Sequence, residues 1–532
     1  MKRNLWLPTL VAVLLAAALA PARAAKTIDF DALTIADINR AFDSGALTSE
    51  ALVRLCLARI QAYDRQGPSL HAVMTLNPKA IDTARALDTE RKAKGPRSPL
   101  HGIPVVLKDN YNTSDLPTTG GSVLLEGSIP PDDAFVVKKL RAAGAIVLAK
   151  LNMSEFASGG AHSSLGGQSL NPHDLTRTPS GSSGGTGVAI AAAYAPLGMG
   201  TDTGGSIRGP STSNGIVGLK PTHGLLSRSG IIPLSLSFDT GGPMARSVSD
   251  VAIALGIMTG VDATDAATKK SEGKAETDYT KYLKADSLNG ARIGIARDFL
   301  GADPDVDYVV EAALAAIKKA GATIVDVRYP KWLLDAKGEF YTAVRYPEFT
   351  VQIAEYLAGT GPKYPKSLAE MIERANQFTG TREDGARPNP SRWSLFKRES
   401  DSGTMADYRY KSVHDFGLPM VRTVVEGVFA EQRLDAIVYP TSSRRPGLIA
   451  ALPGGGGGTP SATNIANLTG FPDLIVPAGF SGDGLPVGLS FFGPAFSEPR
   501  LLALGYSFEQ TTQARRRPVH TPALPGATIS VP

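Results

Sequence analysis

The residues best suited to chemistry in this chain are serines in two glycine-rich loops. One loop reads Ser180-Gly181-Ser182-Ser183-Gly184-Gly185-Thr186, and the other reads Gly200-Thr201-Asp202-Thr203-Gly204-Gly205-Ser206-Ile207-Arg208. Glycine lets a ligand or another backbone approach closely, and consecutive N–H groups in such a loop can hold an anion. A serine placed there can act as a nucleophile beside a ready oxyanion site. Apolar runs flank both loops, which favours a folded site over a flexible linker.

A serine hydroxyl is a weak nucleophile until a base removes its proton, and three kinds of base could serve here. Gly181-Ser182-Ser183-Gly184-Gly185 matches the G-x-S-x-G elbow of Ser-His-Asp hydrolases, but the polar, proline-containing segment 175–179 replaces the apolar strand that such an elbow requires. None of the seven histidines has a sequence context that marks it as the base. The third arrangement uses a lysine whose amine is desolvated enough to be neutral near pH 7.

Three lysines stand at the ends of short apolar runs that are typical of buried strands. Lys108 follows Val105-Val106-Leu107, Lys150 follows Val147-Leu148-Ala149, and Lys220 follows Val217-Gly218-Leu219. Each of them, taken alone, could equally be a lysine paired with a carboxylate at a sheet edge. The residues by themselves leave the choice open.

The elements that must position these side chains alternate between strand and helix. We expect strands at 103–107 and 145–149, with a helix at 132–143 between them that ends at Gly144. Further strands are expected at 293–296, 323–327, 436–439, 474–476 and 487–491, with a helix at 305–320 between the first two and a final helix at 498–510. This alternation predicts an α/β fold in which a single large domain, residues 25–532, surrounds a mixed, mostly parallel central sheet covered by helices. The catalytic core is expected at about residues 100–250.

The N-terminus has the pattern of a signal peptide. Lys2 and Arg3 precede an apolar stretch over 5–20, and Ala22-Arg23-Ala24 fits a small-residue cleavage site. We therefore predict a signal peptide at residues 1–24, export to the periplasm or beyond, and no stable membrane anchor. Its removal deletes three basic residues and no acidic one, so the formal charge falls by three, from +5 to +2. A nearly neutral protein of this kind is not expected to bind nucleic acid.

Cysteine and histidine usage argues against metal chemistry. Cys56 is the only cysteine, so an intrachain disulfide cannot form, and it shares a helical stripe with apolar residues that predicts a buried structural thiol. The histidines show no HExxH spacing. No metal site is predicted.

Several motifs together resemble the amidase signature family. They are His101-Gly102-Ile103-Pro104-Val105-Val106-Leu107-Lys108-Asp109-Asn110, both glycine loops, Gly215-Ile216-Val217-Gly218-Leu219-Lys220-Pro221-Thr222, Asp239-Thr240-Gly241-Gly242-Pro243-Met244-Ala245-Arg246-Ser247-Val248, Gly470-Phe471-Pro472 and Gly484-Leu485-Pro486-Val487-Gly488-Leu489. They occur in the expected order over nearly the whole mature chain. Two departures, Ser211 and Thr186, lie outside the catalytic positions.

The resemblance implies a Ser-Ser-Lys triad. Ser206 would be the nucleophile, Lys108 the base, and Ser182 the bridging serine, held by a cis peptide bond. Backbone N–H groups of the turn Thr203-Gly204-Gly205 would bind the oxyanion. Asp202 and Arg208 would support that turn.

The same resemblance implies hydrolysis of a carboxylic amide through an acyl-enzyme, without a cofactor. The substrate would be a small-molecule or short peptide amide, and C-terminal peptide amidase or aryl acylamidase activity are the specific alternatives. A Ser-His-Asp esterase and an inactive exported binding protein are the competing hypotheses, and export argues against a role in tRNA amidation. The segments 359–404 and 441–460, which contain the run Gly454–Gly458, are expected to border the acyl-binding cleft.

Overall fold

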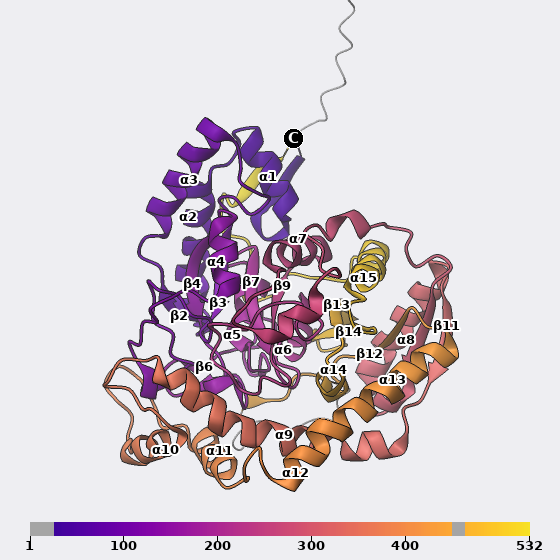
Figure 1. Cartoon of the computed structure of the whole chain (residues 1–532). Coiled ribbons are helices and arrows are strands. Elements are labelled where there is room, and N and C mark those ends of the chain that lie inside the picture. The colour runs from indigo at the N-terminus through magenta and orange to yellow at the C-terminus, as the bar shows by residue number, and fades with distance from the viewer. Residues whose placement is uncertain (1–25, 450–462, 532) are drawn as a thin grey trace, which may run out of the picture.

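A computed structural model describes residues 26–449 and 463–531. The predicted signal peptide and the run Gly454–Gly458 lie outside these residues. The centre of the molecule is one eleven-stranded sheet in the order β11-β10-β12-β14-β13-β8-β9-β7-β3-β4-β2. Helices cover it, as Figure 1 shows, and the predicted α/β fold with a single large domain around a mixed sheet is confirmed.

The strands of this sheet come from residues spread over most of the chain. They are β2 (Val73–Leu76), β3 (Pro104–Lys108), β4 (Ile146–Leu151), β7 (Leu197–Asp202), β8 (Val217–Lys220), β9 (Thr240–Ala245), β10 (Arg292–Ala296), β11 (Thr323–Val327), β12 (Ala436–Pro440), β13 (Asp473–Phe480) and β14 (Pro486–Phe492). A separate antiparallel pair, β1 (Lys26–Asp29) with β15 (Thr528–Val531), joins the two ends of the described chain, and β5 (His162–Ser163) pairs with β6 (Gly167–Gln168).

Parallel pairing is confined to two parts of the sheet. β11, β10 and β12 run parallel at one end, and β7, β3 and β4 run parallel near the other. Between these two groups every neighbouring pair, from β12·β14 to β9·β7, is antiparallel, and β2 adds a further antiparallel pair at the edge. Antiparallel pairs therefore outnumber parallel ones, which differs from the mostly parallel pairing that the sequence predicted. Alternation of strand and helix indicates crossover connections, and these occur within each parallel group, whereas the strands between the two groups pair with antiparallel neighbours.

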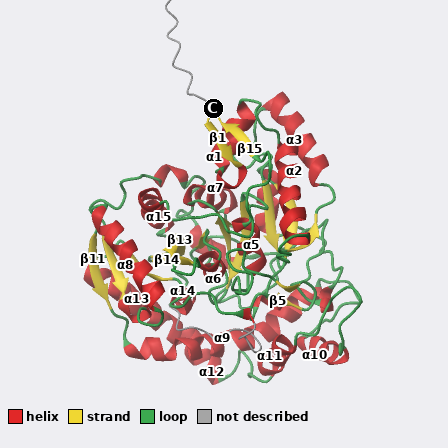
Figure 2. Cartoon of the chain, turned by 180° about the vertical axis from the view of Figure 1, so that it is seen from behind, coloured by secondary structure: helices red, strands yellow, loops and turns green. Residues whose placement is uncertain are grey.

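The helices fall into groups by the part of the sheet they cover. Those of the core and N-terminal part are α1 (Ile35–Asp43), α2 (Ser49–Ile60), α3 (Ala80–Lys94), α4 (Phe135–Ala142), α5 (Gly184–Ala191), α6 (Arg208–Ser213), α7 (Val248–Met258), α8 (Pro304–Lys319), α14 (Thr463–Thr469) and α15 (Glu498–Thr512). Five others, α9 (Lys331–Ala358), α10 (Leu368–Gln377), α11 (Pro390–Ser400), α12 (Tyr408–Lys411) and α13 (Leu418–Gln432), form a band along the lower edge in Figure 1. Figure 2 shows the same band from behind.

Local sequence explains where several of these elements begin. Thr34 caps α1 in a reciprocal box with Asp37, and Asp303 caps α8, whose first residue is Pro304. All eight residues of α5 are small or aliphatic and buried, so this helix packs directly on β3 and β7. The main core is apolar and lies on both faces of the sheet, and Cys56 is buried within it, where desolvation raises the pKa of its thiol to about 12. The predicted structural role of this thiol is consistent with that burial.

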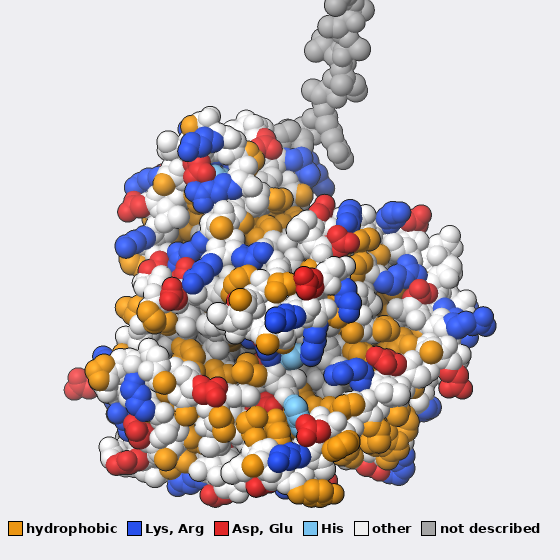
Figure 3. Space-filling model, viewed as in Figure 1, with side chains coloured by type: hydrophobic (Ala, Val, Ile, Leu, Met, Phe, Trp, Pro, Cys, Tyr) orange, Lys and Arg blue, Asp and Glu red, His pale blue; other side chains and the backbone are white. Residues whose placement is uncertain are grey.

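The outer surface agrees with a nearly neutral protein. On the face drawn in Figure 3, basic and acidic side chains are interspersed, with apolar groups between them. Among the described residues, no helix combines the length and the apolar character needed to cross a bilayer.

Candidate active site

The carboxyl ends of β3 and β7 meet at one edge of the sheet and carry the first two residues of the site. The two strands are parallel neighbours, with Leu107 opposite Met199. Lys108 is the last residue of β3, and Thr201 lies two residues beyond Met199. In sheets of this kind, ligands bind beyond the carboxyl ends of the strands. The fold thus places this pair where a site is expected.

Lys108 is fully buried and contacts oxygen atoms only. Its Nζ lies 2.7 Å from Ser182 Oγ, 2.7 Å from Thr201 Oγ1 and 3.4 Å from the Thr201 carbonyl oxygen. Of the described residues, no carboxylate lies within ion-pair distance of this amine. Burial lowers the pKa of Lys108 to about 7, and the more distant carboxylates Asp202 and Asp239 only partly oppose that effect. Burial therefore favours the neutral, basic form of this lysine.

The first glycine loop brings Ser182 onto this amine. The Gly181–Ser182 peptide bond is cis, and Ser182 is 1% exposed. The Ser154 N–H donates to the Ser182 carbonyl oxygen over 3.0 Å, and the Ser183 N–H donates to the Ser206 carbonyl oxygen over 3.2 Å. The loop is therefore fixed to the core on one side and to the second glycine loop on the other.

Ser206 lies in a turn that is folded around the carboxylate of Asp202. Asp202 Oδ1 accepts the Gly205 N–H at 2.9 Å, and Oδ2 accepts the Ile207 N–H at 3.0 Å. Ser206 is partly exposed, whereas Ser182 is buried. Ser206 is thus the more accessible of the two serines, and Ser182 is the one that contacts the lysine.

Arg208 fixes the same carboxylate from the other side and connects it to the C-terminal part of the chain. Its guanidinium forms an ion pair with Asp202 at 3.0 Å and with Asp473 at 3.1 Å, and it donates to Asn467 Oδ1 at 2.6 Å. Burial opposes the ionisation of Asp202, but the charge and hydrogen bonds of Arg208 outweigh it and hold the pKa of that carboxyl far below its usual value. The supporting role predicted for Asp202 and Arg208 agrees with these contacts.

The three residues predicted to bind an oxyanion are held in different ways. Gly205 has φ +124°, a conformation that favours glycine, and its N–H is directed at Asp202. A Cβ atom at Gly204 would come within 2.8 Å of the Tyr341 hydroxyl, so the turn needs glycine there too. The Thr203 hydroxyl donates to Asp239. The Gly205 N–H therefore helps to hold the turn, and oxyanion binding by Thr203, Gly204 and Gly205 stays a prediction.

The other two strand-end lysines are also buried, but they contact different groups. Lys150 Nζ lies 3.2 Å from Asp109 Oδ1 and donates to Thr118 Oγ1 at 2.7 Å. Lys220 donates to the carbonyl oxygens of Phe471 and Pro221, although burial lowers its pKa to about 7 as well. Of the three lysines, Lys108 is the one that the structure brings onto a serine of the glycine loops.

Three of the seven histidines contact backbone groups of the fold. His101, His173 and His223 each face a backbone carbonyl oxygen, of Leu87, Asn214 and Leu236 respectively. Within the described ranges, no group of three or more histidine, cysteine, aspartate or glutamate residues is placed to hold a metal ion.

A cavity of about 590 Å³ lies next to the first glycine loop. Its walls are segment 158–162 and Gln168 on the core side, residues 388–392, Leu395 and Arg398 on the other side, and Ile449. The cavity adjoins the catalytic loop, since a Cβ atom at Gly181 would come within 2.8 Å of the Gly159 carbonyl oxygen. Both stretches that were expected to border the acyl cleft, 359–404 and 441–460, contribute described residues to this cavity. The lining residues do not include Ser206 or Ser182, so a cleft above Ser206 stays a prediction.

Sequence reasoning missed several residues that hold the site. Thr201 contacts Lys108, Asp239 contacts Thr203 of the serine turn, and Asn467 and Asp473 contact Arg208. Asn110 acts one step further out, because its amide donates to the Thr201 hydroxyl. In the order of the chain these residues are Asn110, Thr201, Asp239, Asn467 and Asp473. The first three lie inside the amidase-like motifs, so the signal for them was present there. Asn467 and Asp473 are more than 250 residues from Arg208 in the chain, and only the folded sheet brings them close.

The fold and this lysine–serine cluster define an α/β enzyme whose candidate base is a lysine. A family model described as Amidase matches residues 51–502. The glutamyl-tRNA(Gln) amidotransferase A subunit of Myxococcus xanthus is 37% identical over 497 residues, covering 91% of this chain and 98% of that protein. The crystal structure of the native peptide amidase from Stenotrophomonas maltophilia superposes with a TM-score of 0.83 at 38% identity, covering 92% and 99% of the two chains.

A more distant relative gives the same fold. The glutamyl-tRNA(Gln) amidotransferase A subunit of Thermotoga maritima superposes with a TM-score of 0.70 at 26% identity, covering 92% of this chain and 98% of the other. The chain belongs to the amidase family and is an enzyme that acts on carbon–nitrogen amide bonds.

Proposed function

We propose that this protein hydrolyses carboxylic amides through an acyl-enzyme at Ser206, with Ser182 and Lys108 as the proton relay. The observation that carries the proposal is the contact of 2.7 Å between Ser182 Oγ and the amine of Lys108, which has no carboxylate partner among the described residues. A neutral amine is a base, whereas an ion-paired ammonium is not.

In the first half of the reaction the Ser206 oxygen attacks the amide carbonyl carbon. The Ser206 proton passes to Ser182, and the Ser182 proton passes to Lys108 Nζ. The relay then returns a proton to the amide nitrogen, because an amine leaves only when it is protonated. The C–N bond breaks, and the acyl group stays on Ser206 as an ester.

In the second half, water attacks that ester with the same relay as its base. The acid product leaves, and Ser206 regains its proton. Every proton taken up by Lys108 is given back within one cycle, so the reaction needs no oxidant, reductant or cofactor.

The similarity to the peptide amidase of S. maltophilia supports peptide amides as the substrate class. Within that class we propose the C-terminal amide of a short peptide. The cavity of about 590 Å³ beside the catalytic loop is large enough for an acyl group of several residues, and we assign the acyl part of the substrate to it. Aryl acylamidase activity is the alternative. The chain is about as similar to amidotransferase A subunits, at 37% identity, as it is to the peptide amidase, at 38% identity. The signal-peptide pattern of residues 1–24 favours an exported hydrolase over a subunit that takes part in tRNA amidation.

The test is ammonia or arylamine release by the mature protein from matched peptide amides, acyl anilides and simple fatty amides. We expect the peptide amides to be turned over with the highest kcat/KM. Acylation of the peptide that contains Ser206, found by mass spectrometry after acid quenching, would identify the nucleophile. Acyl transfer to any other serine, or turnover by Ser206→Ala, would contradict the proposal.

A further inference from the structure

The amine of Lys108 has three oxygen neighbours, and their number matters for its chemistry. A neutral amine carries two N–H groups and one lone pair. To take a proton from Ser182, the lone pair must point at Ser182 Oγ, so both N–H groups must point elsewhere. The Thr201 side chain offers Oγ1 at 2.7 Å, and the Thr201 backbone offers its carbonyl oxygen at 3.4 Å. One residue thus supplies acceptors for both N–H groups.

Thr201 Oγ1 has a further partner, because the Asn110 amide nitrogen donates to it over 3.0 Å. A hydroxyl oxygen accepts two hydrogen bonds and donates one. With Lys108 and Asn110 as donors, both acceptor positions are filled, and the hydroxyl proton needs an acceptor of its own. Thr201 is only 5% exposed, so bulk water does not supply it.

The Asn110 side chain has an oxygen that lacks a hydrogen-bond donor in the described part of the chain. It is 2% exposed, and its Oδ1 accepts no hydrogen bond from the described residues. A buried polar atom left without a partner costs about 1–3 kcal/mol, so such atoms are normally satisfied by protein or by an ordered water. One small molecule that both accepts and donates a hydrogen bond could therefore satisfy Thr201 and Asn110 together.

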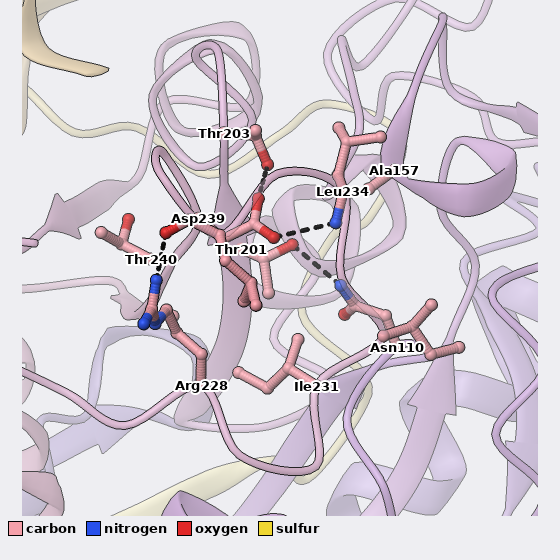
Figure 4. Close-up of a pocket in the computed structure, with 12 residues that line it drawn as sticks. Asn110, Ala157, Thr201, Thr203, Arg228, Ile231, Leu234, Asp239 and Thr240 are labelled. Carbon is pink, nitrogen blue, oxygen red and sulfur yellow. Dashed lines mark hydrogen bonds between the residues drawn. The ribbon is translucent and has the colours of Figure 1, made fainter. Parts of the chain in front are cut away.

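A small cavity of about 10 Å³ borders both of these side chains. Figure 4 shows Thr201 and Asn110 facing each other at its border, with Thr203, Asp239 and Ile231 among the other lining residues. A space of roughly 10–15 Å³ of this kind accommodates one water molecule when polar partners are available. The cavity has room for one water and no more.

We propose that Thr201 directs the lone pair of Lys108 at Ser182, and that one water molecule between the Thr201 hydroxyl and Asn110 Oδ1 fixes the orientation of that hydroxyl. The water accepts the Thr201 O–H and donates to Asn110 Oδ1. This inference rests on the proposed role of Lys108 as the base. Thr201 acts through Lys108 and is a positioning residue.

The arrangement serves both protonation states of the lysine. When Lys108 is an ammonium, its three N–H groups match three acceptors: Ser182 Oγ, Thr201 Oγ1 and the Thr201 carbonyl oxygen. No side chain has to rotate as the proton arrives and leaves. A site whose dipoles are already in place avoids reorganisation during the reaction.

The first experiment compares Thr201→Val with Thr118→Val. Valine keeps the shape of threonine and removes the hydroxyl. Thr118 is the matched control, since its Oγ1 accepts from another buried lysine, Lys150, at the same distance of 2.7 Å. We expect Thr201→Val to lower kcat by roughly 10²-fold with little change in KM, within the range by which proton-transfer groups contribute.

The pH profile separates positioning from mere stability. Loss of a hydrogen bond to the ammonium favours neutral Lys108, so the acid limb of kcat/KM in Thr201→Val should move to lower pH while the plateau falls. Thr201→Ser, which keeps the hydroxyl, should restore both the plateau and the limb. If Thr201→Val matches Thr118→Val in kcat and limb, Thr201 has no positioning role. If Lys108→Ala instead keeps the limb, the proposed function itself is wrong.

The water is tested by a high-resolution crystal structure of the wild-type enzyme. We expect density for one water within hydrogen-bond distance of both Thr201 Oγ1 and Asn110 Oδ1. An empty cavity, or an Asn110 amide whose nitrogen faces the cavity, would overturn this part of the proposal.

Discussion

Lys108 and Lys150 are close neighbours in similar positions, yet the structure gives them different surroundings. Lys108 is the last residue of β3 and Lys150 the last but one of the adjacent parallel strand β4, and both are fully buried. Leu107 lies opposite Lys150, and Lys108 lies opposite Leu151. Burial lowers the pKa of each. Lys150 has the carboxylate of Asp109 at 3.2 Å, whereas Lys108 has hydroxyl and carbonyl oxygens only.

The comparison shows that burial alone does not identify a catalytic lysine. Asp109 follows Lys108 directly in the sequence, but side chains alternate along an extended chain, and its carboxylate faces Lys150 instead. Lys220 is a second buried lysine that does not contact a serine of the two described glycine loops. Its pKa is lowered to about 7, as that of Lys108 is, but it donates to backbone carbonyl oxygens. A low pKa becomes useful only beside a group that has a proton to give.

The largest effect is expected from the pair Lys108→Ala and Lys150→Ala. Loss of Lys108 should lower kcat/KM by on the order of 10²–10⁴-fold, since the relay then has no base. Lys150→Ala should lower the yield or stability of the folded protein, while the folded fraction keeps its activity. Active-site titration followed by steady-state kinetics separates the two. Equal losses of activity per folded molecule would remove the distinction between the two lysines.

Ser182→Ala and Ser183→Ala test which hydroxyl lies on the Lys108 side of the loop. Ser182→Ala should cost roughly 10²-fold in kcat, less than Ser206→Ala, because a water can partly replace a relay hydroxyl. The Ser183 hydroxyl contacts the backbone of Thr201, with its Oγ 3.2 Å from both the carbonyl oxygen and the amide nitrogen, so its loss should act mainly on stability. A severe loss at Ser183 with none at Ser182 would show that the relay runs through the other serine.

The pH profile gives a smaller but more specific effect. Lys108 is active when neutral, and its pKa is about 7. Below that value the ammonium predominates and kcat/KM should fall tenfold per pH unit, while above it kcat/KM should reach a plateau. Lys150→Ala and Lys220→Ala should keep this acid limb. A limb that moves in either variant would assign the titration to a lysine other than Lys108.

The smallest effect on activity is expected from Asp109→Asn. This change leaves Lys150 buried without its carboxylate, so it should lower the free energy of unfolding by about 3 kcal/mol. Denaturant unfolding measures this loss. Because Asp109 faces Lys150, the acid limb of the remaining activity should stay in place, and a shifted limb would show that Asp109 acts on Lys108.

Strands with continuous apolar runs were predictable from the sequence. The expected strands at 103–107 and 145–149 correspond to β3 and β4, each within two residues. The long helix α9 was missed, since Gly338 and Pro347 interrupt its pattern, and so were the two helices α10 and α11 within segment 359–404. The order of the strands was not predictable, because pairing in this sheet joins segments that are far apart in the chain.

The residues of the site likewise include some that the sequence predicts and some that it does not. Glycine loops and strand-end lysines are local signals, and the resemblance of their motifs pointed to Lys108, Ser182 and Ser206, of which the structure places the first two in contact. The side chains that orient them are set by tertiary contacts. Nothing in the local sequence shows that Asp109 faces Lys150, or that Asp473 and Asn467 reach Arg208.

The link between Arg208 and residues 467–473 has a consequence for how the enzyme is made. Arg208 is fully buried, and two of its partners lie in the last 70 or so residues of the chain. During synthesis the turn that carries Ser206 therefore emerges from the ribosome more than 250 residues before Asn467 and Asp473. The turn can therefore acquire its ion pair with Asp473 and its hydrogen bond to Asn467 only after residue 473 has been synthesised.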